Sequence, residues 1–299
     1  MGSVQLRLWS VCLSVVLACV CQTARGTIVN GGNGGSYNTT TPAVDFPYWD
    51  NIGQWHNSSG SLVGGCFYLG NSWVLVANHQ WQLDGGAAAT VELDGASYDI
   101  IEGSDVRITN GDGSGADLRK FRIDGSPSLA GITTDNIITS TPAIDAEVYM
   151  IGLGRDREDT ETFFPGLGFG YYWTSNRYKR WGTNDVTSTG IDPGTYGTTS
   201  YFATTWDRNA GDNECQATSG DSGGTVFVND AGTWKLAGVM FGAEFYYDSG
   251  ADKHLSVYGT DTYVADLSVY RGQIPEPATA GPLALGLFGL MLRRRRRHR

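Results

Sequence analysis

Residues 61–77 read SLVGGCFYLGNSWVLVA, two apolar runs on either side of Gly70-Asn71-Ser72. β-Branched and aromatic residues favour extended backbone, and Gly-Asn-Ser favours a tight turn, so this stretch predicts a β-hairpin. The same arrangement recurs from Thr90 to Ile101, around Asp94-Gly95. Further strands are predicted at Leu118–Ile123, Glu147–Leu153, Tyr201–Thr205, Thr225–Val228 and Trp234–Phe241.

Short strands and turns run through most of the 299-residue chain, which contains 42 glycines, so we expect an all-β fold. Residues 27–60 are expected to form an extended lead-in with loops. The region Asp124–Pro142 is rich in Ser, Thr, Gly and Pro, and we place the seam there between an N-terminal half (27–135) and a C-terminal half (136–272). The best helix candidate is Asp261–Tyr270, whose apolar residues recur at helical spacing.

The N-terminal end has the pattern of an export signal. Within residues 1–26, Arg7 precedes an apolar stretch from Leu8 to Val20, and Ala24-Arg25-Gly26 offers small residues for a cleavage site. A transmembrane helix is the alternative, but the apolar stretch is too short to favour it. We therefore expect residues 1–26 to be a signal peptide and the protein to be exported.

The C-terminal end, residues 273–299, is also expected to lie outside the folded part. Pro275-Glu276-Pro277 precedes an apolar stretch, Ala278 to Leu292, and an arginine cluster from Arg293 to Arg297. This combination resembles the PEP-CTERM sorting tail of Gram-negative bacteria that produce exopolysaccharide. The resemblance implies transient anchoring in the inner membrane and processing by an exosortase-type enzyme, with delivery to the cell surface or the medium. A plain C-terminal membrane anchor is the alternative.

The charge of the chain excludes several partners. The formal net charge is −10, and eight of the 21 Lys and Arg residues lie in the two ends, so the part between them is more acidic still. Such a surface repels nucleic acid and anionic membranes, and we expect no nucleic-acid partner.

The cysteines are consistent with export but do not define a set of disulfide bonds. Of the five cysteines, only Cys66 and Cys215 lie beyond the signal peptide. They can pair in an oxidising compartment, but their spacing does not decide whether they do. The Cys and His spacings indicate no zinc site, and we expect no metal and no cofactor.

The stretch TSGDSGGTVFV, residues 218–228, places Ser222 among glycines before a predicted strand. The alternatives are a Gly-rich turn and a nucleophile, and a serine nucleophile needs a base that is itself oriented by a third group. Of the four histidines, His79 is the best candidate because it follows the apolar run WVLVAN, whereas His56 and His254 are expected in loops and His298 lies in the tail.

Three segments together resemble chymotrypsin/trypsin-like serine proteases. GGCFYLGNSWVLVANH (64–79) is similar to the family's segment around the catalytic histidine, and GDSGG (220–224) to its nucleophile motif. ADLRKFRI (116–123) is similar to its aspartate segment, with Asp117 in place and the order His, Asp, Ser preserved. The resemblance implies two six-stranded antiparallel β-barrels with a short C-terminal helix, and an active site between them.

The resemblance also implies a function. Ser222 would be the nucleophile, His79 the general base and Asp117 its orienting group, and the N–H groups of Gly220 and Ser222 would form the oxyanion hole. The expected activity is serine endopeptidase action on proteins or peptides through an acyl-enzyme. In the substrate pocket, ungapped counting places Gln216 at the floor and Gly242 at one wall.

The sequence departs from the family at several positions. Gln80 and Thr218 stand where the family has cysteines, Asn78 where it has an alanine beside the histidine, and Met240 where a serine often backs the aspartate. These departures keep open the alternative of a catalytically inactive protease-like protein that binds a surface or a matrix.

The segment TIVNGG (27–32) resembles the family's mature N-terminus, whose amine pairs with the aspartate before the nucleophile, here Asp221. Cleavage of the signal after Gly26 would leave Thr27 first, one residue longer than that pattern. We therefore expect trimming before Ile28.

Overall fold

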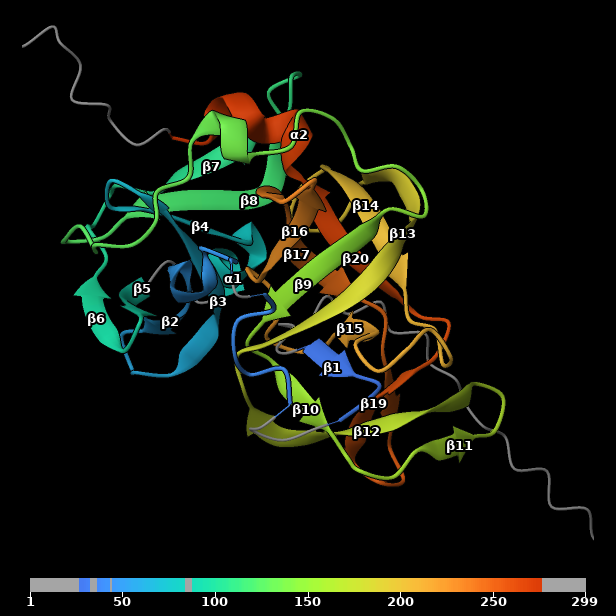
Figure 1. Ribbon diagram of the computed structural model, residues 1–299. Coiled ribbons are helices and arrows are strands. Elements are labelled where there is room, and N and C mark those ends of the chain that lie inside the picture. The colour runs from blue at the N-terminus through green and yellow to red at the C-terminus, as the bar shows by residue number, and fades with distance from the viewer. Residues whose placement is uncertain (1–26, 33–36, 44, 84–87, 276–299) are drawn as a thin grey trace, which may run out of the picture.

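The computed structural model describes residues 27–32, 37–43, 45–83 and 88–275 (Figure 1). The expected signal peptide and nearly all of the expected sorting tail lie outside these residues. The described chain is mostly β-strand, with only short helices. Within the described residues, no helix is long and apolar enough to cross a membrane.

The N-terminal half is an antiparallel sheet with the strand order β6-β5-β2-β3-β4-β8-β7. Its strands are β2 (Ile52–Asn57), β3 (Leu62–Gly70), β4 (Trp73–Val76), β5 (Ala88–Leu93), β6 (Ala96–Asp99), β7 (Val106–Thr109) and β8 (Gly115–Arg122). The sheet closes on itself where Ile100, directly after β6, pairs with Ile123, directly after β8. Two backbone hydrogen bonds flank that pair, Ile101 N–H to the Arg122 oxygen at 2.9 Å and Asp124 N–H to the Asp99 oxygen at 2.7 Å.

The C-terminal half is a closed antiparallel barrel with the strand order β13-β14-β20-β17-β16-β9. Its strands are β9 (Glu147–Gly152), β13 (Arg180–Asp192), β14 (Thr199–Thr205), β16 (Thr225–Asp230), β17 (Thr233–Ala243) and β20 (Asp261–Asp266). The expected all-β fold with two barrels is therefore present, although a short β-bridge completes the first barrel and full strand pairing completes the second.

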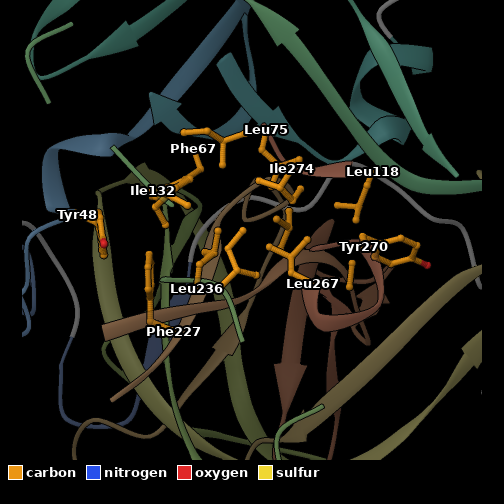
Figure 2. Close-up of a cluster of buried hydrophobic side chains, with 14 of the residues drawn as sticks. Tyr48, Phe67, Leu75, Leu118, Ile132, Phe227, Leu236, Leu267, Tyr270 and Ile274 are labelled. Carbon is orange, nitrogen blue, oxygen red and sulfur yellow. The ribbon is translucent and has the colours of Figure 1, made fainter. Parts of the chain in front are cut away.

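A large apolar cluster joins the two halves (Figure 2). Phe67, Leu75 and Leu118 contribute from the N-terminal half, and Phe227 and Leu236 from the C-terminal half. All five side chains have no measurable exposure. Because this close-packed cluster lies between the barrels, it fixes their relative orientation. Residues at the junction of the barrels are therefore held in fixed positions.

Five additional strands form a sheet of their own beside the C-terminal barrel (Figure 1). They are β10 (Arg155–Arg157), β11 (Thr162–Phe164), β12 (Gly168–Arg177), β18 (Tyr246–Asp248) and β19 (Lys253–Val257). This sheet was not predicted from the sequence, and the prediction that His254 lies in a loop is wrong, because this histidine lies in β19. The last two strands, β1 (Thr27–Val29) and β15 (Cys215–Ala217), pair with each other.

The expected helix Asp261–Tyr270 is wrong over most of its length. Residues 261–266 form β20, and only Leu267–Tyr270 form the helix α2, followed by the 3-10 turn η3 (Arg271–Gln273). Thr262 and Val264 are buried while Asp261 and Tyr263 are partly exposed, which is a two-residue alternation. β20 pairs with β14 on one side and with β17 on the other, and this pairing closes the barrel and overrides the helical spacing.

The lead-in 27–60 is also more regular than expected. It contains β1, the 3-10 turn η1 (Trp49–Asn51) and β2, so His56 lies in a strand and not in a loop. At the other end, the Gln273 side chain exchanges hydrogen bonds with the Thr109 backbone, and Ile274 is buried in the cluster between the barrels. The packed part of the chain thus extends to Ile274.

Candidate active site

Three polar side chains that are far apart in the sequence meet at the junction of the barrels. The Nδ1 atom of His79 lies 2.7 Å from Oδ2 of Asp117, and its Nε2 atom lies 2.8 Å from Oγ of Ser222. The structure therefore brings His79, Asp117 and Ser222 into one hydrogen-bonded chain. His79 and Asp117 come from the N-terminal half, and Ser222 comes from the C-terminal half.

Local structure explains how His79 and Asp117 meet. Strand β4 pairs with β8 and ends at Val76, and the chain then turns into the short helix α1 (Asn78–Leu83). His79 thus lies in the first turn of a helix and not at the end of the strand, as the sequence had suggested. Its backbone N–H donates to Oδ1 of Asp117 at 2.6 Å, so one carboxylate fixes both the main chain and the ring of His79.

The opposite barrel also holds Asp117. The N–H of Asp117 donates to Oγ1 of Thr199 in β14 at 2.9 Å, across the junction between the halves. Sequence reasoning missed Thr199, because a threonine in a β-branched strand carries no signal of such a contact.

Ser222 lies in the loop 218–224, between β15 and β16, and two glycines shape this loop. Gly220 and Gly223 have φ values of 108° and 82°, where an L-residue would be strained. A Cβ atom on Gly223 would lie 2.0 Å from the carbonyl oxygen of Gly65. Within the described residues, no backbone carbonyl accepts a hydrogen bond from the N–H of Gly220 or of Ser222.

The three side chains are almost closed to solvent. Ser222, His79 and Asp117 are 0%, 1% and 3% exposed. The ring of Tyr196, from the connection between β13 and β14, packs beside the imidazole, with ring centroids 5.5 Å apart and 44° between the ring planes. The Tyr196 carbonyl accepts hydrogen bonds from Asn78 and Arg107 of the other half. Sequence reasoning did not identify Tyr196, which lies in a Gly-rich loop without a recognisable motif.

Asn78 and Met240, two of the departures from the family, both have structural partners. Oδ1 of Asn78 accepts a hydrogen bond from Nε of Arg119 at 2.9 Å, which ties the start of α1 to β8. Met240 is buried in the core of the C-terminal barrel, and its backbone exchanges hydrogen bonds with Gly223 and Gly224. Met240 therefore supports the serine loop through its main chain.

The two expected pocket residues both lie in strands of the C-terminal half. Gln216 lies in β15 and is fully buried, with Oε1 accepting from Thr260 at 2.9 Å and Nε2 donating to the Glu244 carbonyl at 2.9 Å. Both ends of its amide are thus bonded within the C-terminal half. Gly242 lies in β17, where an added Cβ would meet only Tyr263, at 3.6 Å.

Asp221, next to the nucleophile candidate, is a fully buried carboxylate. Oδ2 accepts from the N–H of Thr218 at 2.8 Å, and Oδ1 accepts from the Thr27 hydroxyl at 3.4 Å. Burial raises the pKa of Asp221 well above its usual range. The first described residue therefore lies beside Asp221, in the region that the resemblance assigned to the mature N-terminus, and Ile28 is fully buried in the next position.

Both remaining cysteines are free thiols in separate cores. Cys66 belongs to the core of the N-terminal barrel and Cys215 to that of the C-terminal barrel. Burial raises the pKa of each thiol, which keeps both unreactive. Among the residues that the structure describes, no group of His, Cys, Asp or Glu is arranged to hold a metal ion.

Comparisons with known proteins give only structural matches. No family model and no curated protein matches the chain. The inactive form of a serine-to-alanine mutant of Rv3671c from M. tuberculosis H37Rv matches with 14% identity and a TM-score of 0.45, over 78% of this chain and 94% of its own. A further inactive form of the Rv3671c protease matches with 12% identity and a TM-score of 0.44, over 80% and 99%.

The HRV-C 3C protein with rupintrivir matches with 13% identity and a TM-score of 0.41, over 78% of this chain and 98% of its own. With identities and TM-scores this low, the matches carry no argument about chemistry.

Proposed function

We propose that this protein is a secreted serine endopeptidase that hydrolyses peptide bonds in proteins or peptides. One observation carries the proposal: the ring of His79 bridges Asp117 and Ser222, with contacts of 2.7 and 2.8 Å. Because Asp117 can only accept, Nδ1 carries the ring proton and Nε2 is free to take one from Ser222. A hydroxyl so placed is an activated nucleophile.

The chemistry follows from that arrangement. Oγ of Ser222 attacks the scissile carbonyl carbon while Nε2 of His79 takes its proton. The N–H groups of Gly220 and Ser222 stabilise the oxyanion, and the loss of one such donor typically costs about 10²–10³ in turnover. The imidazolium then gives its proton to the leaving amine, an ester forms on Ser222, and water hydrolyses it by the same route. No step requires a cofactor.

The second candidate is a catalytically inactive binding protein on the same scaffold. The observation that favours it is the burial of the site, in which Ser222 is 0% exposed and the ring of Tyr196 contacts His79. A fluorophosphonate probe distinguishes the two candidates, because it reacts only with an activated serine. Labelling of the wild type but not of Ser222→Ala supports the peptidase. Absence of labelling in both the wild type and Tyr196→Ala, which opens the site, supports the binding protein.

Export is the second part of the proposal, and it rests on the sequence of the two ends. Residues 1–26 would direct secretion, and the tail within residues 273–299 would anchor the chain transiently until an exosortase-type enzyme removes it. N-terminal sequencing and intact mass measurement of protein from the culture medium test both steps. A secreted chain that keeps residues 278–299 would contradict the sorting tail, and a first residue other than Ile28 in fully active protein would contradict the trimming.

A further inference from the structure

Gln80, the residue after His79, also contacts Ser222. Nε2 of Gln80 donates to the main-chain carbonyl oxygen of Ser222 at 2.6 Å, and Gln80 is fully buried. The same oxygen accepts the N–H of Gly65 at 2.9 Å. Consecutive residues of α1 thus hold the same serine, His79 through its hydroxyl and Gln80 through its main chain.

The surrounding backbone leaves room for this amide. A Cβ atom on Gly64 would lie 1.7 Å from Nε2 of Gln80, and one on Gly223 would lie 2.9 Å from Oε1. The glutamine amide therefore fits between Gly64 in β3 and Gly223 in the serine loop, one from each half of the molecule. Any side chain at either position would collide with it or force it to move.

Only one end of the Gln80 amide forms a hydrogen bond within the described residues. Oε1 of Gln80 is buried and has no hydrogen-bond partner within the described residues. An unpaired buried oxygen is unfavourable for folding, and an apolar side chain of similar shape would avoid that cost. The contact with Ser222 is the feature that an apolar replacement cannot reproduce.

The peptide group between Ser222 and Gly223 is held at both ends. Two donors bind its carbonyl oxygen, and its N–H donates to the Met240 carbonyl at 2.9 Å. We propose that Gln80 is a positioning residue, which clamps the main chain of Ser222 to α1 and so keeps the serine hydroxyl aligned with the imidazole of His79. This inference rests on the proposed peptidase function. A misplacement of about 1 Å can cost roughly 10²-fold in rate.

Two substitutions in the full chain test the clamp. Gln80→Met keeps the length of the side chain and removes the donor, and Gln80→Glu also removes the donor while its carboxylate is ionised. Gln82→Met, at an exposed position of α1, is the matched control. The measurements are kcat and KM on a peptide substrate per site titrated with the fluorophosphonate probe, together with thermal unfolding. Titration confines each value to molecules whose serine still reacts.

The clamp predicts a loss of about 10- to 100-fold in kcat for Gln80→Met, with KM within about twofold of the wild type and little change in Tm. Gln82→Met behaves as the wild type. As the pH falls, kcat of Gln80→Glu should approach that of the wild type, because a protonated carboxyl can again donate to the Ser222 carbonyl. The ratio of kcat between Gln80→Met and the wild type should stay constant with pH. A merely structural role would not produce that difference.

If kcat per titrated site is unchanged in Gln80→Met, the clamp is refuted. It is also refuted if the loss of kcat in Gln80→Glu does not depend on pH. If Gln80→Met does not fold, the pH dependence of Gln80→Glu decides alone. Absence of labelling in both the wild type and Tyr196→Ala counts instead against the proposed peptidase, so the two failures can be told apart.

Discussion

Replacing Asp117 by asparagine should reverse the tautomer of His79. In the wild type, Oδ1 accepts the backbone N–H of His79 at 2.6 Å, and Oδ2 lies 2.7 Å from Nδ1. In Asp117→Asn, the amide oxygen keeps the backbone bond, so its NH₂ group faces Nδ1 and donates to it. The ring proton then lies on Nε2, which can no longer accept the proton of Ser222.

The expected loss of kcat in Asp117→Asn has two causes. The carboxylate stabilises the imidazolium that forms during attack, and two unit charges about 4 Å apart attract by about 4 kcal/mol at an effective dielectric constant of about 20. This alone corresponds to roughly 10³-fold in rate. The wrong tautomer adds to the loss, and the same substitution in a Ser-His-Asp enzyme lowers kcat by about 10⁴. We expect a loss of about 10⁴ in kcat here.

The assay is kcat on a chromogenic peptide substrate, with circular dichroism to confirm that the variant is folded. Asp124→Asn, at an exposed position just beyond β8, is the matched control and should retain wild-type activity. A loss of less than about tenfold in a folded Asp117→Asn variant would refute the role assigned to Asp117.

Three further predictions concern groups around the site and in the core. Tyr196→Ala should speed fluorophosphonate labelling several-fold, because it removes the ring beside His79 and keeps the carbonyl that Asn78 and Arg107 bind; slower labelling would contradict this role of the ring. Burial raises the pKa of Glu214 from 4.5 to about 8, so the folded state binds a proton that the unfolded state releases. Stability should therefore fall as the pH rises from about 5 to 8, by up to about 1.4 kcal/mol per unit, and Glu214→Gln should remove this slope in urea unfolding; a constant difference between variant and wild type would argue against it. Phe227→Ala should cost about 3–5 kcal/mol of unfolding free energy by urea denaturation, because its fully buried ring packs between the barrels; a loss below about 1 kcal/mol would show that the cluster adjusts easily.

Much of the fold was readable because strand signals are local. The runs on either side of Gly70-Asn71-Ser72 became β3 and β4, and those around Asp94-Gly95 became β5 and β6. The helix at Asp261–Tyr270 was wrong because tyrosines and valines fit both spacings, and barrel closure by distant strands decides between them. The pairing of β12 with β19 joins segments more than 80 residues apart, which no local pattern reveals. The hairpins β11–β12 and β18–β19 in the same sheet are local and were also missed.

Some residues of the candidate site could be predicted from the sequence, and others could not. His79, Asp117 and Ser222 carry motifs, and the structure places them in contact. The contacts of Thr199 and Tyr196 depend on how the second barrel faces the first, and that orientation is set by the apolar cluster between them. Such contacts leave no trace in the spacing of residues along the chain.

The most direct test of the account is to find where a fluorophosphonate attaches. We predict a single adduct on Ser222 of the folded wild-type chain, located by peptide mass spectrometry, and a rate at least about 100-fold lower in His79→Ala. No adduct on Ser222, or an adduct that forms equally fast without the His79 imidazole, would contradict the claim that these side chains act as one unit.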